Sequence, residues 1–367
     1  MKNTKGITLV ALVITIVILL ILAEISIQAI TQTNLFDKTK QARNATENAQ
    51  KEENRTLSTY TDKINEYLPE TLLYKVKNGE IAIGSYVNYE PDTLDENKLA
   101  TLKNNLNTYS GVANDENNTI NPAIKRDNLK WRVLDIDEKT GGVRLISAET
   151  TDSIIQLYGY NGYNNAVKLI DDACSTLYNN NNLTSKVQNL KIEDITKYLK
   201  EQQIENTTEY TPTNINYPKI LEQDKNQTVE KSSITNKLNE SEQNIFVTGN
   251  DISSTSTLRK TSWTKIFTDD DFLNYIYYEL YINNGENYPT YWIASRCIDP
   301  FPNLAIFNVR SVYNSGVATT PICYSYNGDQ YPFSYALRPV ITLNSNLQLD
   351  TENPGEGTEN NAYNIKL

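Results

Sequence analysis

Residues 131–146, which read WRVLDIDEKTGGVRLI, contain two short apolar runs on either side of a polar turn. The runs at 131–136 and 143–146 are rich in the aromatic and branched residues that favour β-strands. Between them, Lys139-Thr140-Gly141-Gly142 has the composition of a tight turn. This stretch therefore predicts an antiparallel hairpin within a globular head.

Further strand-like segments occur at both ends of this head. Upstream, residues 81–83 and 86–89 read as short strands separated by Gly84. Downstream, the strand-like segments are 291–296 (YWIASR), 304–310 (LAIFNVR) and 336–343 (ALRPVITL), with a turn at 314–316. Together these segments predict a small antiparallel sheet.

Two or three helices are expected between the strands. In the first, one face carries the apolar or small residues Ala166, Val167, Ile170, Ala173, Cys174 and Leu177. Cys174 is therefore expected to be a small buried residue and not a nucleophile. The second helix is expected at 192–199 and the third at 271–281. Polar composition predicts a long loop at 91–128, an insertion at 203–262 and a frayed tail at 350–367.

The N-terminal residues have a different pattern. No charged residue occurs from Ile7 to Ala23, and two lysines precede this run. At about 1.5 Å per residue, a helix over this run is roughly 26 Å long, just enough to cross the hydrocarbon core of a membrane. We therefore expect a membrane-spanning segment at 7–30, with the N-terminus cytoplasmic and the head extracellular. The helix is expected to continue over 31–68 and to end at Pro69; a separate anchor with a solvated stalk helix is the alternative.

The stretch Lys5-Gly6-Ile7-Thr8-Leu9-Val10-Ala11-Leu12-Val13-Ile14 resembles the start of Firmicute-type type IV prepilins and pseudopilins. The resemblance implies a leader at 1–6, cleavage after Gly6 by a prepilin peptidase, N-methylation of Ile7, and other pilin subunits as partners. Ala11 stands where that family usually has Glu, and Ile7 where it usually has an aromatic residue, Met or Leu. Because that Glu favours fibre assembly in the family, a minor or tip subunit is expected and not a fibre-building pilin.

The head resembles the C-type-lectin-like fold, which formylglycine-generating enzymes share. The motifs that carry this resemblance are 131–134 (WRVL), 145–147 (LIS), 291–296 (YWIASR) and 337–340 (LRPV), within a head at 70–349. In that fold, long loops beside a small sheet bind ligands. The implied binding face lies between 291 and 335, with candidates Trp292, Arg296, Arg310, Tyr313, Asn314, Tyr324, Tyr326 and Asp329. For two residues a structural role is favoured instead: a core position for Trp292 and a salt bridge for Arg338.

Composition limits the chemistry of the chain. The net charge is −11, without a dense Lys/Arg cluster, which disfavours a nucleic-acid-binding surface. The chain has no histidine, which removes His-dependent catalysis and His metal sites. Its 25 tyrosines suit ligand recognition, although a bias toward AT-rich codons gives the same enrichment. Asp269-Asp270-Asp271 is expected to cap a helix and not to bind calcium, and no metal or cofactor is expected.

The three cysteines form no CxxC pair, so a zinc site is not expected. Cys297 and Cys323 are 26 residues apart across a predicted strand–turn–strand, a span that a structural disulfide can close. Free buried thiols are the alternative. The same pair supports a second hypothesis, a cysteine-dependent oxidase of the formylglycine-generating type.

These patterns predict an α+β protein. It is expected to have a long N-terminal pilin-like transmembrane helix and a loop-rich C-type-lectin-like head with a small antiparallel sheet and two or three helices. The expected function is that of a non-enzymatic cell-surface protein, similar to a minor pilin or pseudopilin, whose head binds a glycan or protein. The alternatives are a membrane-anchored oxidase and a structural pilus or secretion component without a ligand.

Overall fold

The computed structural model describes residues 15–16, 46, 49–50, 53, 56, 68–112, 119–201, 209–210, 215–217, 246, 252–254, 258–282, 290–302, 304–313, 316–318, 322–324 and 331–367. The chain divides into two units, Met1–Thr61 and Asp62–Leu367. All strands that the structure describes belong to the second unit, which is the head.

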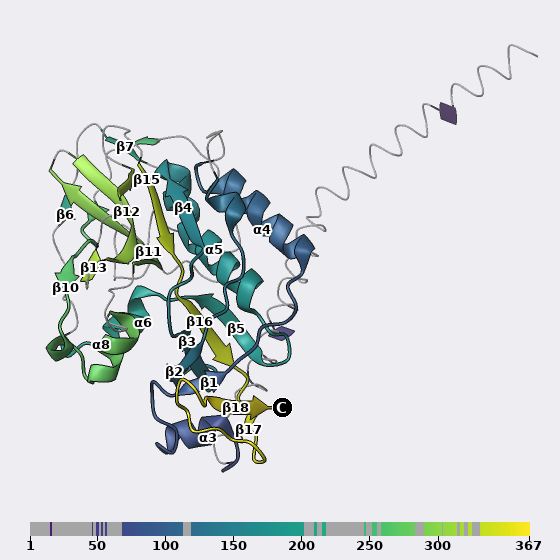
Figure 1. The fold of residues 1–367 in the computed structure, drawn as a ribbon. Coiled ribbons are helices and arrows are strands. Elements are labelled where there is room, and N and C mark those ends of the chain that lie inside the picture. Colours follow the sequence, from purple (N-terminus) through teal and green to yellow (C-terminus); the bar gives the residue numbers. More distant parts are fainter. Residues whose placement is uncertain are drawn as a thin grey trace, which may run out of the picture. The chain divides into compact units, whose positions relative to one another are not determined.

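The head contains two seven-stranded sheets (Figure 1). The first has the order β17-β18-β1-β2-β3-β16-β5, with bounds Gln348–Leu349, Tyr363–Lys366, Tyr86–Asn88, Trp131–Ile136, Val143–Ser147, Pro339–Leu343 and Thr184–Asn189. The second has the order β10-β13-β12-β11-β15-β4, with β14 beside β12. Its bounds are Lys265–Ile266, Gly316–Ala318, Leu304–Tyr313, Tyr291–Phe301, Pro332–Ala336, Ile154–Tyr158 and Ile322–Tyr324. Two small ribbons pair β6 (Glu209–Tyr210) with β9 (Leu258–Arg259) and β7 (Ile215–Tyr217) with β8 (Ile252–Ser254).

The predicted hairpin is confirmed as β2 and β3. The two strands are antiparallel, with Trp131 opposite Ser147, and a bulge lies between Val133 and Asp135. β16 then pairs with β3, so a segment almost 200 residues later in the chain extends the hairpin. The strand expected at 81–83 is not formed; the chain turns there, and the N–H of Gly84 donates to the carbonyl of Val133.

Helix α5 (Gly159–Tyr178) packs against strands of both sheets. Its buried face includes Leu169, Ile170, Ala173 and Cys174, which are all fully enclosed. The prediction that Cys174 is a buried residue is therefore confirmed. Burial raises the pKa of its thiol well above the ordinary value, because a thiolate loses its hydration there.

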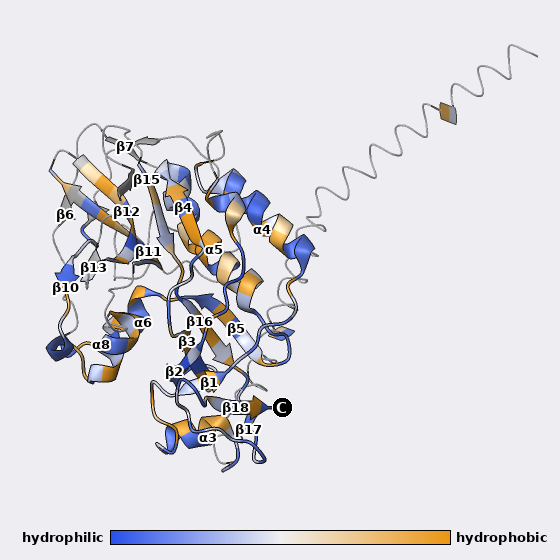
Figure 2. Cartoon of the chain, in the orientation of Figure 1, coloured by the Kyte–Doolittle hydropathy of each residue, from blue (hydrophilic) through white to orange (hydrophobic). Residues whose placement is uncertain are grey.

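The loop expected at 91–128 contains a helix, α4 (Glu96–Tyr109), so that prediction is wrong. Asp95 caps the helix, because its carboxylate accepts the N–H groups of Asn97 and Lys98. Leu99, Leu102 and Leu106 form the buried stripe, and polar residues cover the rest of the helix (Figure 2). This three-leucine stripe at helical spacing is the signal that the Asn-rich composition concealed.

The remaining helices whose bounds the structure describes are short. They are α3 (Leu72–Lys77), α6 (Ile192–Thr196) and α8 (Tyr275–Tyr281), with the 3-10 turns η1 (Asn121–Ala123) and η2 (Asp269–Asp271). α6 confirms the helix expected at 192–199 but ends at Thr196. α8 confirms the helix expected at 271–281 but begins at Tyr275. The acidic triplet is itself the turn η2, in which the Asp271 carboxylate accepts the backbone N–H of Thr268, whereas Asn274 caps α8.

The C-terminal tail is folded, not frayed as predicted. β18 runs parallel to β1, with Val87 opposite Tyr363, and antiparallel to β17, with Leu349 opposite Ile365. The strand forms because β1 offers a free edge to it, and its own four residues alternate between sheet faces. The head therefore extends to the last residues of the chain.

The predicted fold class needs correction. In the part of the chain that the structure describes, no helix is long and apolar enough to cross a membrane. The longest described helix, α5 with 20 residues, carries Lys168 and Asp172 on its outer side. The expected transmembrane helix is therefore not seen, and the small antiparallel sheet is replaced by two larger ones that include parallel pairs.

Most of the N-terminal predictions lie outside the described residues. These are the leader at 1–6 with Gly6 and Ile7, the segment 7–30 except for Thr15 and Ile16, and most of the continuation at 31–68. The insertion at 203–262 is described only at a few short stretches.

Candidate functional site

Three residues of the predicted binding face between 291 and 335 are buried. Trp292 is fully buried in β11, and its indole N–H donates to the carbonyl of Ile155 at 2.8 Å. Arg296 is buried with its guanidinium 5.4 Å from the centre of the Tyr163 ring. Arg310, in β12, is also enclosed and donates to the carbonyl of Thr261. Three of the candidates are thus core residues, because β11 and β12 are covered on both sides.

The other candidates do not form a described cluster. Tyr313 is exposed at the end of β12. Tyr324 lies in β14 with its side chain outside the described atoms, and Asn314, Tyr326 and Asp329 lie outside the described residues. The core position favoured for Trp292 is confirmed.

Arg338 is likewise buried, as its structural role requires. It donates to the carbonyl of Leu280 at 2.8 Å and lies 5.7 Å from the ring centre of Tyr291. Its described partners are therefore a carbonyl and a ring, and not the carboxylate that the sequence led us to expect.

The expected disulfide is not formed, because Cys297 is a buried free cysteine. Cys297 lies opposite Asn308 of β12, and β14, which holds Cys323, pairs with the other edge of β12. Strands lie about 4.8 Å apart, so strands on either side of a third are roughly 10 Å apart, whereas the Cα atoms of a disulfide lie within about 7 Å. Burial also raises the pKa of the Cys297 thiol.

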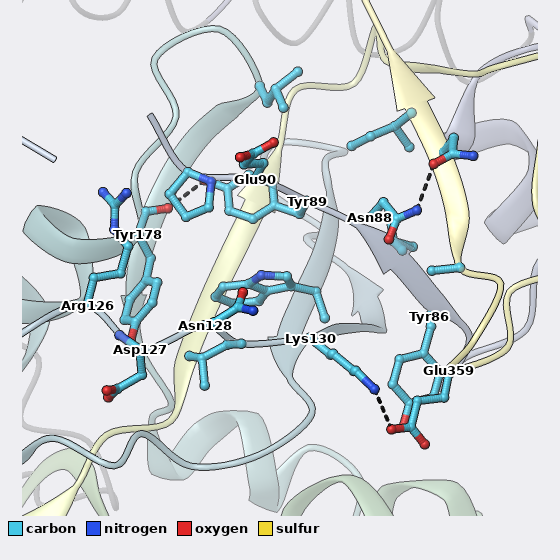
Figure 3. Close-up of a pocket in the computed structure, with 18 residues that line it drawn as sticks. Tyr86, Asn88, Tyr89, Glu90, Arg126, Asp127, Asn128, Lys130, Tyr178 and Glu359 are labelled. Atoms are coloured by element: carbon cyan, nitrogen blue, oxygen red, sulfur yellow. Dashed lines mark hydrogen bonds and ion pairs between the residues drawn. The ribbon is translucent and has the colours of Figure 1, made fainter. Parts of the chain in front are cut away.

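The described residues do contain a different concave site, at the end of the first sheet. A pocket of about 710 Å³ lies where β1 and β2 separate. Four parts of the chain line it: residues 86–91, residues 126–131, the pair Tyr178 and Leu183, and a C-terminal part that includes Glu359, Asn364 and Ile365. Figure 3 shows these side chains around the cavity. The volume is within the range of about 300–1,000 Å³ that is typical of ligand sites.

The floor of the pocket is a fixed aromatic cluster. The Trp131 ring meets Tyr89 at 5.3 Å and Tyr178 at 5.7 Å between ring centres, both edge to face. The Tyr89 hydroxyl donates to the carbonyl of Tyr178, and the Tyr178 hydroxyl accepts the N–H of Asp127. Burial raises the pKa of both hydroxyls, so both stay protonated at neutral pH. The floor is therefore rigid and neutral.

The wall between β1 and β18 carries amides and an ion pair. The amide of Asn88 donates to that of Asn364 at 2.7 Å, which joins the two strands through their side chains. Lys130 and Glu359 form an exposed ion pair at 2.7 Å. The hydrogen bond between them raises the pKa of Lys130 and lowers that of Glu359. Asn88, Lys130 and Glu359 are labelled on this side of the pocket in Figure 3.

On the opposite wall, two charged residues serve the fold. Arg126 donates to the carbonyls of Leu177 and Asp92, and Asp127 accepts the N–H of Ser153. Glu90 and Asn128 differ from them, because both are exposed and no side-chain bond is recorded for either among the described residues. The pocket thus presents one uncommitted carboxylate and several amides, which both donate and accept hydrogen bonds.

Sequence reasoning missed this site, although it identified the Trp131 strand. The sequence predicts a strand and a loop for most of residues 86–91 and 126–131, and a frayed tail for the C-terminal part. The signal that was available is the group of tyrosines and Asn residues that flank the two strands, together with the alternation of Tyr363 and Ile365. Among the described residues, no group of three or more acidic or cysteine side chains could hold a metal ion.

Comparisons with known proteins give no further assignment. No protein-family model matches the chain, and neither a curated protein nor a solved structure does.

Proposed function

We propose that this protein is a non-enzymatic binding protein whose ligand occupies the pocket between β1 and β2. The observation that supports the proposal is the composition of the pocket: a rigid aromatic floor, a wall of amides and an uncommitted carboxylate at Glu90. Sites that bind small or extended ligands combine an apolar base with a few placed polar groups in this way.

Binding is favoured over catalysis by the state of the titratable groups. Arg126 and Asp127 are bonded to the backbone, Lys130 is paired with Glu359, and the hydroxyls of Tyr89 and Tyr178 are protonated and bonded. A general acid or base needs a pKa near the working pH and a free position toward the substrate. The hypothesis of a cysteine-dependent oxidase gains no support, because Cys297 is a buried free cysteine.

The proposal is tested with the full-length protein on glycan and peptide arrays. Asn128 is replaced by Trp to fill the pocket from an exposed rim position, and Asn107 of α4, also exposed, receives the same substitution as the matched control. We expect a ligand that binds about tenfold or more weakly to the Asn128→Trp protein and equally to the control. Binding that survives Asn128→Trp unchanged, or arrays without any ligand, would contradict the proposal.

We also propose that the chain is displayed at the cell surface as a protein of the minor-pilin type, processed between Gly6 and Ile7. The leader motif Lys5-Gly6-Ile7 supports this part of the proposal. Co-expression with a prepilin peptidase should give a mature chain that starts at N-methylated Ile7, measured by intact mass. A mature chain that keeps residues 1–6 refutes this type of processing and leaves the pocket proposal unaffected.

A further inference from the structure

The pocket lies where the β1–β2 ladder stops, two residues beyond its last pair. Val87 is opposite Trp131, and the strands are antiparallel. In such a ladder, backbone bonds recur at every second residue, so the next bonded pair in this register is Tyr89 with Leu129. No hydrogen bond joins the backbones of these two residues in the described structure. Both residues line the pocket.

The backbone N–H and carbonyl groups at the open end of this ladder have no hydrogen-bond partner elsewhere among the described residues. Among the described residues, no bond is recorded to the N–H or carbonyl of Tyr89 or Leu129. The neighbouring groups are used: the carbonyl of Glu90 accepts from Asn180, the N–H of Asp127 donates to Tyr178, and the carbonyl of Lys130 accepts from Ala148. The pocket therefore contains strand-like donors and acceptors that face a cavity in place of a neighbouring strand.

Other contacts hold the residues on both sides of this opening in place. The Tyr89 hydroxyl is held by the carbonyl of Tyr178, and Pro91 follows two residues later. On the other side, Asp127 is tied to Ser153. On its other edge, β1 is already paired with β18, so only the edge toward Leu129 is open.

We propose that the ligand of this pocket is an extended peptide, whose backbone pairs with Tyr89 and Leu129 and whose basic side chain meets Glu90. This inference rests on the proposed binding function and names its ligand class. Free strand edges bind peptides through main-chain hydrogen bonds, and side-chain pockets add specificity. The Glu90 carboxylate is the uncommitted charge of the pocket among the described residues, and it favours Lys or Arg in the ligand.

The geometry favours a peptide over a carbohydrate. A sugar ring binds aromatic side chains through an open ring face. Here Trp131 is 2% exposed, Tyr178 1% and Tyr89 6%, so the aromatic floor offers little face for stacking. The accessible groups are instead backbone amides, Asn side chains and a carboxylate, which match the donors and acceptors along a peptide chain.

The test selects random heptapeptides displayed on phage against the full-length protein, and the selected peptide is then synthesised. Each backbone nitrogen of the synthetic peptide is methylated in turn, and affinity is measured by titration calorimetry. Neighbouring residues of a strand direct their N–H groups to opposite edges, so a peptide between Tyr89 and Leu129 bonds through two adjacent residues. Methylation should weaken binding roughly tenfold at that one adjacent pair of nitrogens and little at the other positions. The Glu90→Gln protein should bind a Lys-containing peptide about two- to fivefold more weakly, a difference that salt reduces.

The outcomes separate this inference from the proposed function. A peptide that loses affinity on the Asn128→Trp protein, and that is weakened by methylation at one adjacent pair of nitrogens, supports both. A glycan that binds in the pocket, with no selectable peptide, overturns the inference and keeps the proposed function. A peptide whose affinity is unchanged by methylation at every position also overturns it. Absence of any ligand sensitive to Asn128→Trp overturns both.

Discussion

Glu193, in the first turn of α6, has a carboxyl group that is largely buried. The Oε2 atom is enclosed and has no recorded hydrogen-bond partner among the described residues. Burial raises the pKa of this group from its ordinary value of 4.5 to about 7, with the neighbouring Asp194 acting in the same direction. We predict that replacing Glu193 with Gln removes a pH-dependent loss of stability from the head.

The size and sign of this effect follow from linkage. The folded pKa is above the unfolded one, so the stabilising contribution is complete below about pH 4.5 and is lost as the pH rises through 7. At about 1.4 kcal/mol per pKa unit, the loss is about 3 kcal/mol by pH 8. Gln carries no charge at any of these pH values, so the variant should not lose this contribution.

The assay is urea unfolding of the full-length protein from pH 5 to pH 8, followed by circular dichroism. The free energy of unfolding of the Glu193→Gln protein, relative to wild type, should rise by about 2–3 kcal/mol across this range. Glu149→Gln, at an exposed position, is the matched control for the substitution itself. If the Glu193→Gln difference is flat within about 0.5 kcal/mol, the buried-carboxyl argument is wrong.

Three further predictions concern stability, all measured by chemical or thermal unfolding. Arg144→Met should lower the free energy of unfolding by about 3–5 kcal/mol, because the guanidinium of Arg144 bonds the buried carboxylates of both Asp135 and Asp194. A near-neutral result would contradict this. Gly111→Ala should cost at least about 2 kcal/mol more than Gly79→Ala, since both have positive φ but only at Gly111 would a Cβ lie 1.8 Å from the carbonyl of Tyr158. Equal costs would mean that the backbone there moves freely. A chain that ends at Asp350 lacks β18, and its thermal unfolding midpoint should be several degrees lower than that of the full chain, by about 2–4 °C for each kcal/mol of stability that the strand contributes. An unchanged midpoint would show that β18 contributes nothing to stability.

The elements that sequence reasoning predicted are those with strong local signals. The β2–β3 hairpin has two dense apolar runs around a Gly-containing turn, and α5 repeats apolar residues with helical spacing over five turns. In both, local preference and tertiary burial favour the same structure. The weak stripe of α4 has only three leucines among polar residues, so composition suggested a loop and tertiary packing decided otherwise.

The candidate binding residues failed for a different reason. Arg296 and Arg310 are charged residues at the ends of predicted strands, which is typical of surface positions, yet both are buried beside aromatic rings. Sequence pattern places a residue on one face of a strand but does not show what covers that face. Here helix α5 and the segment at Thr261–Trp263 cover β11 and β12.

The pocket required information that no single segment contains. Its aromatic floor joins Tyr89, Trp131 and Tyr178, and one wall comes from Asn364 near the C-terminus. β18 is a strand because β1 accepts it, and β1 is open toward Leu129 because Tyr89 and Asp127 are held elsewhere. Unpaired backbone groups are costly unless water or a ligand satisfies them. A sheet that stops one bonded pair early, beside a cavity, is the feature on which the proposed peptide site depends, and the methylation experiment tests it.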